Sequence, residues 1–298
     1  MGAGGYSARS LPPKVPANMI VSASYRTDIP AFYGAWFAGR LRAGYAVLKN
    51  PYGGKPSRVS LAPADVDGVV LWTKNARPFD EGFTALEGAG LPFVVQYSIT
   101  GLPRAIERSV PAGEAAIADL RRLGDRYGKR AVVWRFDPIV VSDLSPLVER
   151  QATFAQLAKA LAGAVDEVVV SFMEPYAKAR RNLSGVDWRD PSAAEKQGLL
   201  QTFANVAADN GMALTLCSQP DLPGTPARCV DAKRLSDVAG REIAARTKGN
   251  RPGCLCAESR DIGAYDSCAM GCGYCYAVRD RPRAQRALSG HDPSAEGL

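Results

Sequence analysis

The chain of 298 residues contains one histidine, His291, and no cysteine before Cys217. A single histidine argues against Ser-His-Asp or Cys-His catalysis, and it rules out a two-histidine metal site within one chain. No segment reaches the roughly 18 consecutive apolar residues of a membrane-spanning helix. Residues 1–18 lack the apolar core of a secretory signal. These absences predict a cytoplasmic protein whose thiols stay reduced.

The composition is that of a globular protein, with 46% hydrophobic and 22% charged residues. The 37 basic and 30 acidic residues leave a net charge of +7. Such a balance admits an anionic partner, and the arginine-rich residues 279–286 could contact nucleic acid. No further nucleic-acid signature supports that contact, so we expect residues 279–298 to form a flexible basic tail.

Short apolar runs alternate with helix-like stretches between residues 19 and 216. The runs predict buried strands at residues 19–24, 68–72, 92–99, 130–136, 167–172 and 212–216. Amphipathic spacing predicts helices at residues 31–41, 112–127, 147–161 and 193–210. Continuous apolar strands that alternate with helices indicate parallel β/α units. We therefore expect an α/β fold, a full or partial TIM-like β/α barrel, with an open doubly wound sheet as the alternative.

Polar residues follow most of these predicted strands. Because the carboxyl ends of parallel strands meet at one edge, such residues are candidates for ligand contacts. The set comprises Arg26, Asp28, Lys74, Gln96, Arg135, Asp137 and Glu174. Arginine suits a carboxylate, and an acidic residue suits an ammonium group. Structural ion pairs remain the alternative for each of them.

The clearest motif is Cys268-Ala-Met-Gly-Cys272-Gly-Tyr-Cys275, which has the spacing C-x3-C-x2-C. Three thiolates can bind three irons of a [4Fe–4S] cluster and leave the fourth iron open to a small chelating molecule. Gly271 and Gly273 allow the backbone to wrap closely around such a cluster. A closed structural zinc site would need a fourth ligand, which this motif does not supply.

The motif resembles the signature of the radical S-adenosylmethionine (SAM) enzymes. The resemblance implies that Cys268, Cys272 and Cys275 bind a [4Fe–4S] cluster and that Tyr274 packs near the adenine of SAM. It also implies that the open iron is chelated by SAM, which is cleaved to a radical that abstracts hydrogen. In those enzymes the motif usually follows the first strand. Here a permuted order is expected, in which residues 255–262 form the strand before the loop and residues 19–24 the strand after it.

A second resemblance covers most of the chain. Five motifs together resemble an uncharacterised bacterial family, domain of unknown function 1848. They are SASYRTDIPAFY at residues 22–33, KNPY at 49–52, WTKN at 72–75, WRFDPI at 134–139 and the cysteine-rich residues 254–277. This family supplies no reaction or substrate.

Four cysteines lie outside the C-x3-C-x2-C motif. They are Cys217, Cys229, Cys254 and Cys256. Four thiolates can close a tetrahedral site, so a second iron–sulfur cluster or a structural zinc is one interpretation. Ordinary buried residues and loop thiols are the other.

These observations predict a radical-SAM-type enzyme that uses a [4Fe–4S] cluster and SAM on an unknown small-molecule or macromolecular substrate. An electron donor such as flavodoxin or ferredoxin would be its partner. A metal- or cluster-binding module without catalysis, and a radical SAM enzyme acting on nucleic acid, are the alternatives. We expect a flexible leader at residues 1–18, the barrel at 19–216, a cysteine-rich part at 217–278 that completes the barrel, and the basic tail.

Overall fold

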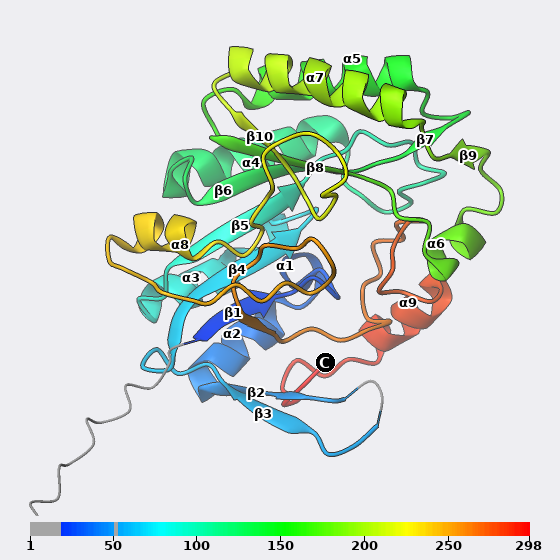
Figure 1. The fold of residues 1–298 in the computed structure, drawn as a ribbon. Helices are drawn as coiled ribbons and strands as arrows, with labels where there is room; N and C mark the ends of the chain where they lie inside the picture. Colours follow the sequence, from blue (N-terminus) through cyan, green and yellow to red (C-terminus); the bar gives the residue numbers. More distant parts are fainter. Residues whose placement is uncertain (1–18, 51–52) are drawn as a thin grey trace, which may run out of the picture.

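The structure is a computed structural model that describes residues 19–50 and 53–298. Seven parallel strands form its central sheet (Figure 1). In chain order they are β1 (Met19–Ala23), β4 (Val66–Thr73), β5 (Phe93–Ser98), β6 (Val132–Ile139), β8 (Glu167–Phe172), β10 (Ala213–Leu216) and β11 (Ser259–Asp261). The α/β fold and its parallel strands are confirmed.

The strands follow the spatial order β10-β8-β6-β5-β4-β1-β11. From β1 to β10 each new strand is added on the same side, whereas β11 returns to the free side of β1. Its register places Ile20 opposite Ser259 and Ser22 opposite Asp261. The strand expected at residues 255–262 is thus present as the shorter β11, and it lies beside the first strand. Within the described residues β10 does not pair with β11 but is bordered by residues 225–227, so of the full or partial barrel that was expected the closed form is not observed.

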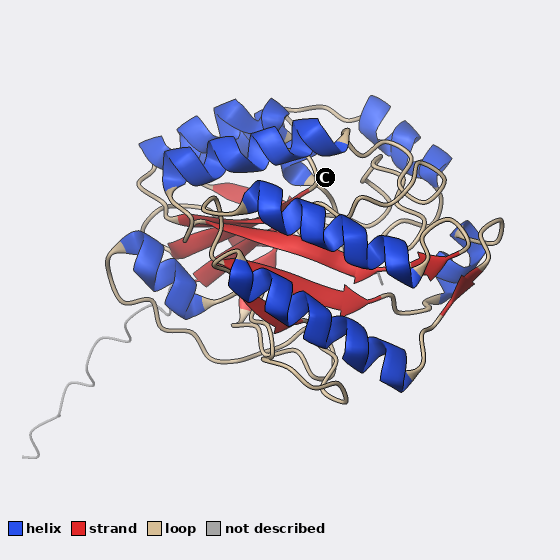
Figure 2. Cartoon of the chain, turned by 90° about the horizontal axis from the view of Figure 1, so that it is seen from above, coloured by secondary structure: helices blue, strands red, loops and turns tan. Residues whose placement is uncertain are grey.

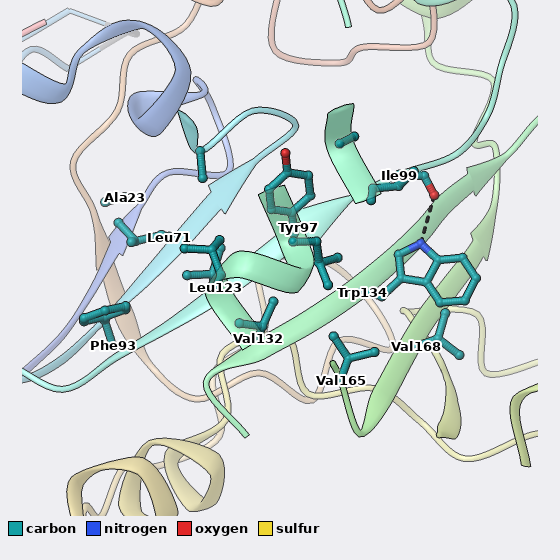
Figure 3. Packing of buried hydrophobic residues seen from close by; sticks show 14 of the residues in the cluster. Ala23, Leu71, Phe93, Tyr97, Ile99, Leu123, Val132, Trp134, Val165 and Val168 are labelled. Carbon is teal, nitrogen blue, oxygen red and sulfur yellow. Dashed lines mark hydrogen bonds between the residues drawn. The ribbon is translucent and has the colours of Figure 1, made fainter. Parts of the chain in front are cut away.

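One face of the sheet is covered by amphipathic helices. These are α2 (Gly34–Ala43), α3 (Asp80–Gly88), α4 (Gly113–Tyr127), α5 (Leu147–Leu161) and α7 (Ala193–Asp209). Their apolar sides pack on strand residues such as Leu71 and Val132. Trp134 belongs to this layer, and its indole Nε1 donates to the Ile99 carbonyl at 2.9 Å (Figure 3). Hydrophobic burial here supplies most of the stability of the fold.

The opposite face is covered by residues 217–258, which contain α8 (Ala232–Ala239) and long loops (Figure 1). Val70 and Val133 of the sheet pack there against Leu235 of α8. Because neighbouring strand residues point to opposite faces, Val69 belongs to the helical layer and Val70 to this one. The central strands are therefore mostly apolar on both faces and are enclosed between layers of helices and loops (Figure 2).

Smaller elements surround the sheet. They are the hairpin β2 (Tyr45–Leu48) and β3 (Ser57–Ser60), the strands β7 (Val141–Ser142) and β9 (Trp188–Arg189), the 3-10 helix η1 (Arg77–Phe79), and the helices α1 (Ile29–Phe32), α6 (Ala177–Asn182) and α9 (Arg281–Ser289). None of the helices in the described ranges is long and apolar enough to cross a membrane.

The end of the chain is ordered by packing, contrary to the expected flexible basic tail. Asp280 caps α9 by accepting from the Arg283 backbone N–H at 2.9 Å. Beyond α9, the Trp36 indole donates to the Ala295 carbonyl at 3.0 Å, and the His291 ring packs edge-on against Tyr33. Aromatic contacts and helix capping therefore outweigh the basic composition of this segment. The predicted leader at residues 1–18 lies outside the described residues.

Truncating Phe154 should test the helical layer, because its ring stacks on Phe203 with centroids 3.9 Å apart and is fully buried. We expect Phe154→Ala to lower the free energy of unfolding by about 3–5 kcal/mol through lost burial and a cavity. Urea unfolding measures this. Val148→Ala on the same helix is the control, because Val148 is 71% exposed. Equal midpoints for the two variants would contradict the packing described.

Candidate functional site

The three-cysteine loop, residues 268–275, lies beside segments that leave the carboxyl ends of β1 and β5. Its backbone is held by the segment after β5: Gly273 N–H donates to the Ile106 carbonyl at 2.8 Å, and Ser109 N–H donates to the Met270 carbonyl at 3.0 Å. Near β1, the Tyr33 hydroxyl donates to the Ser267 carbonyl at 2.7 Å. The pairing of β11 with β1 thus delivers the loop to the edge where parallel α/β folds place active sites.

The three thiols are partly buried and close enough to influence one another's ionisation. Burial raises the pKa of the Cys268 thiol to about 12, and the neighbouring charges of Asp28 and Cys275 add to the effect. Burial also raises the pKa of Cys272 well above its usual value; Lys74 opposes this shift, whereas Glu107 favours it. Three thiolates here would need a cation to compensate them, as iron or another metal does.

The loop conformation depends on its two glycines. Gly271 has a φ of +78°, a region that glycine adopts readily. A Cβ atom at Gly273 would lie 2.5 Å from Leu183 Cδ2, so the backbone passes too close for a larger residue. Within the described chain, no three His, Cys, Asp or Glu side chains already surround a common point as ligands of a metal ion. The three thiols are therefore gathered on one loop but not preassembled around a centre.

Lys74 and Tyr274 meet at Glu107, a residue that the sequence did not single out. Lys74 Nζ donates to Glu107 Oε1 at 2.8 Å, and the Tyr274 hydroxyl donates to the same oxygen. Burial lowers the pKa of Lys74, but Glu107 and Cys272 outweigh it and raise that pKa above its ordinary value. Lys74 therefore stays charged beside Cys272. Glu107 lies in a loop without periodicity, so no sequence signal identified it.

Asp28 is a structural bridge at the ends of β1 and β4. Its carboxylate caps α1 by accepting from Ala31 N–H at 3.0 Å, and it accepts from Lys74 N–H at 2.8 Å. Burial raises its pKa to about 6. Its own backbone N–H donates to the Cys268 sulfur. Both carboxylate oxygens are thus engaged, although the residue lies directly beside the loop as expected.

Arg26 lies beside a second acid that the sequence did not single out, Asp261. Arg26 Nε is 3.8 Å from Asp261 Oδ1, and the guanidinium lies 5.6 Å and 5.1 Å from the ring centroids of Tyr25 and Tyr265. Asp261 accepts from the Ser24 hydroxyl at 2.8 Å and from Tyr25 N–H at 2.9 Å. It therefore joins β11 to the segment after β1. Its position in a predicted strand gave it no distinguishing signal.

Gln96, Arg135 and Asp137 gather at a different place, around Cys229. Arg135 Nη1 donates to Gln96 Oε1 at 3.1 Å and to the Cys229 sulfur at 3.0 Å, and Nη2 donates to Asp137. Gln96 Nε2 donates to the Cys229 carbonyl at 2.9 Å. Glu174 lies in the exposed segment after β8. The seven strand-end candidates therefore separate into distinct groups rather than one ring.

Three buried side-chain oxygens lack a hydrogen-bond partner among the described residues. They are Thr27 Oγ1, Asn75 Oδ1 and Thr100 Oγ1. They lie in the segments that follow β1, β4 and β5, three adjacent strands. Buried polar atoms are normally satisfied, so these oxygens fit a water molecule or the hydrogen-bond donors of a small ligand.

A family model described as a domain of unknown function, DUF1848, matches residues 20–277. No curated protein matches the sequence. Among solved structures, a candidate alpha-L-fucosidase from Bacteroides thetaiotaomicron is similar at 12% sequence identity and a TM-score of 0.30, covering 97% of this chain and 98% of that one. A TM-score this low carries no argument about function.

Replacing Glu107 by Gln should show how strongly the Lys74 contact holds the site. The variant leaves Lys74 charged, only 11% exposed and without its carboxylate, so we expect a loss of about 3–5 kcal/mol in the free energy of unfolding. Urea denaturation measures it. Glu87→Gln is the control, because its pair with Arg126 is 41% exposed on both sides and should cost about 1 kcal/mol or less. A loss no larger than that of the control would refute the role of Glu107.

Proposed function

The chain belongs to the DUF1848 family, and we propose that it is a radical-SAM-type enzyme with a [4Fe–4S] cluster at Cys268, Cys272 and Cys275. The observation that carries the proposal is the three-cysteine loop itself, beside segments that leave the carboxyl ends of adjacent parallel strands. Three ligands on one loop suit a cubane cluster with one iron open to a chelating substrate. The other four cysteines lie within residues 217–258, where Cys229 contacts Arg135 and Cys217. They therefore do not complete this set of ligands.

The strand order supports the permuted arrangement. β11 precedes the loop in the chain and lies beside β1 in space. In space, β11, the three-cysteine loop and β1 therefore follow one another in the strand–loop–strand order that the resemblance implies, although β1 comes first in the chain. On this proposal the sheet is a partial barrel that begins with β11.

Lys74, Glu107 and Tyr274 would hold the loop for the cluster. Lys74 places a positive charge near Cys272 and thereby favours its thiolate form. Glu107 fixes both Lys74 and the Tyr274 hydroxyl. Since that hydroxyl is engaged, Tyr274 would contact adenine through its ring only. With SAM bound, the cluster would supply the electron for cleavage to a radical.

Arg26 is the residue we assign to the SAM carboxylate. Its Nε is buried without a hydrogen-bond partner in the described part of the chain, although Asp261 lies 3.8 Å away, and its guanidinium lies near two tyrosine rings. Arginine pairs with carboxylates through parallel hydrogen bonds. The unpartnered oxygens of Thr27, Asn75 and Thr100 would accept from the amino group or from water. Gln96, Arg135 and Asp137 are engaged around Cys229 and receive no SAM contact in this proposal.

The nucleic-acid alternative loses its main argument, because the arginine-rich segment is folded. Arg281 donates to the Ser109 hydroxyl at 2.8 Å, and Arg283 lies 3.5 Å from an Asp266 oxygen. These arginines do not form a free basic arm. The other alternative is a metal-binding module without catalysis. A measurement of SAM cleavage distinguishes it from the proposed enzyme.

Anaerobic reconstitution with iron and sulfide, followed by reduction with SAM present, tests the proposal. We expect wild type to release 5′-deoxyadenosine, measured by chromatography. The triple variant Cys268→Ala, Cys272→Ala, Cys275→Ala should release none, because the cluster has lost its ligands. Tyr276→Phe, at an exposed neighbour that is no metal ligand, should retain iron and product. If fully iron-loaded wild type leaves SAM intact, the radical-SAM-type activity is refuted and the cluster-binding module without catalysis is the function that remains.

A further inference from the structure

The four cysteines outside the three-cysteine loop converge from three separate segments. Cys217 directly follows β10, Cys229 precedes α8, and Cys254 and Cys256 precede β11. Together they form the four-cysteine group. It lies in the layer of residues 217–258, which covers the face of the sheet opposite the helices. Up to 38 residues of chain lie between its members, so the fold and not a local motif has brought them together.

One pair of these sulfurs has the spacing of two ligands on one metal ion, and binding would draw the other two sulfurs to the same centre, since no three of the four already surround a common point. Cys229 and Cys217 sulfurs are 3.6 Å apart. Two thiolates on a tetrahedral zinc, each about 2.3 Å from the metal, are about 3.8 Å apart. Thiolates on a cubane cluster bind different irons and must lie farther apart. The observed separation therefore favours a mononuclear site over a [4Fe–4S] cluster.

The other contacts close the four-cysteine group into a ring. The Cys256 side chain contacts both Cys229 and Cys254. At the two ends of this chain of sulfurs, the Ser218 hydroxyl lies 3.8 Å from the Cys217 sulfur and also bonds the Cys254 side chain. The Ser218 hydroxyl thus bridges the side chains of Cys217 and Cys254. A metal ion would replace that hydroxyl as the link between them.

Donors around the sulfurs suit a site of net negative charge. Arg135 Nη1 donates to the Cys229 sulfur at 3.0 Å, and Arg251 Nη2 to the Cys217 sulfur at 3.5 Å. Val230 N–H donates to the Cys256 sulfur at 3.3 Å. Zinc with four thiolates carries two negative charges, and two guanidinium groups face it. Such outer contacts orient ligands and stabilise the bound metal.

The covering layer contains little regular secondary structure. Apart from α8, residues 217–258 form no helix or strand, and all seven cysteines are free thiols. Long loops without secondary structure are uncommon unless something constrains them. A shared metal ion would join the end of β10, the segment before α8 and the segment before β11.

We propose that Cys217, Cys229, Cys254 and Cys256 bind one structural zinc ion. Four thiols bind Zn²⁺ as thiolates and release four protons, with no change in oxidation state. The site is closed, because all four positions are filled by protein. It does not depend on the proposed function, since the three-cysteine loop contributes no ligand.

Metal analysis of the purified full chain tests the zinc site. We expect one zinc per chain in wild type and also in the triple alanine variant of the three-cysteine loop. Cys229→Ser should lose that zinc while the three-cysteine loop still takes up iron. Iron and sulfide at the four-cysteine group, retained in the triple variant and lost in Cys229→Ser, would overturn the assignment to zinc.

A second measurement serves if Cys229→Ser fails to fold. Wild type is stripped with a chelator under reducing conditions and titrated with Co²⁺. We expect one equivalent of tetrahedral cobalt with thiolate-to-metal charge-transfer absorption, displaced by one equivalent of Zn²⁺, and the same result in the triple variant. Absence of stoichiometric zinc in wild type together with no tetrahedral cobalt spectrum would overturn the proposal, whatever the protein does with SAM.

Discussion

The parallel pairing of β11 with β1 joins the two ends of the chain, and the candidate site depends on it. That pairing places the strand that precedes the three-cysteine loop alongside the strand that precedes Arg26 and Asp28, and the Tyr33 hydroxyl adds a contact to the Ser267 carbonyl. Asp261 strengthens the junction by accepting hydrogen bonds from Ser24 and Tyr25. A short edge strand of three residues is thereby fixed by side-chain contacts as well as by its ladder.

The two groups of cysteines lie in different electrostatic surroundings. The three-cysteine loop faces Lys74, whose charge is held in place by Glu107. The four-cysteine group faces Arg135 and Arg251, which donate directly to sulfur. In the first group three thiols share one loop, and in the second four thiols arrive from three segments.

Much of the fold was predictable because the strands are buried on both faces. Runs such as residues 68–72 are apolar without alternation, and this pattern indicated parallel strands. The lack of barrel closure within the described residues was not predictable, because it depends on residues 217–258, which cover the face that a closed barrel would enclose. The tail was predicted wrongly because charge dominates its composition, whereas its packing rests on Trp36 and Tyr33.

The candidate site was predictable only where a motif defined it. The spacing of Cys268, Cys272 and Cys275 identified the loop, but Glu107 and Asp261 lie in stretches without periodicity or spacing. Their roles arise from long-range contacts. The same holds for Arg135, which sequence placed with the ligand contacts and the structure places beside Cys229.

Electron paramagnetic resonance of the reduced, reconstituted protein, recorded with and without SAM, tests the central claim most directly. The account predicts a [4Fe–4S] signal that shifts when SAM is added, because SAM would bind the one iron without a protein ligand. A cluster signal that is identical with and without SAM would contradict it, since every iron would then be closed to exogenous ligands.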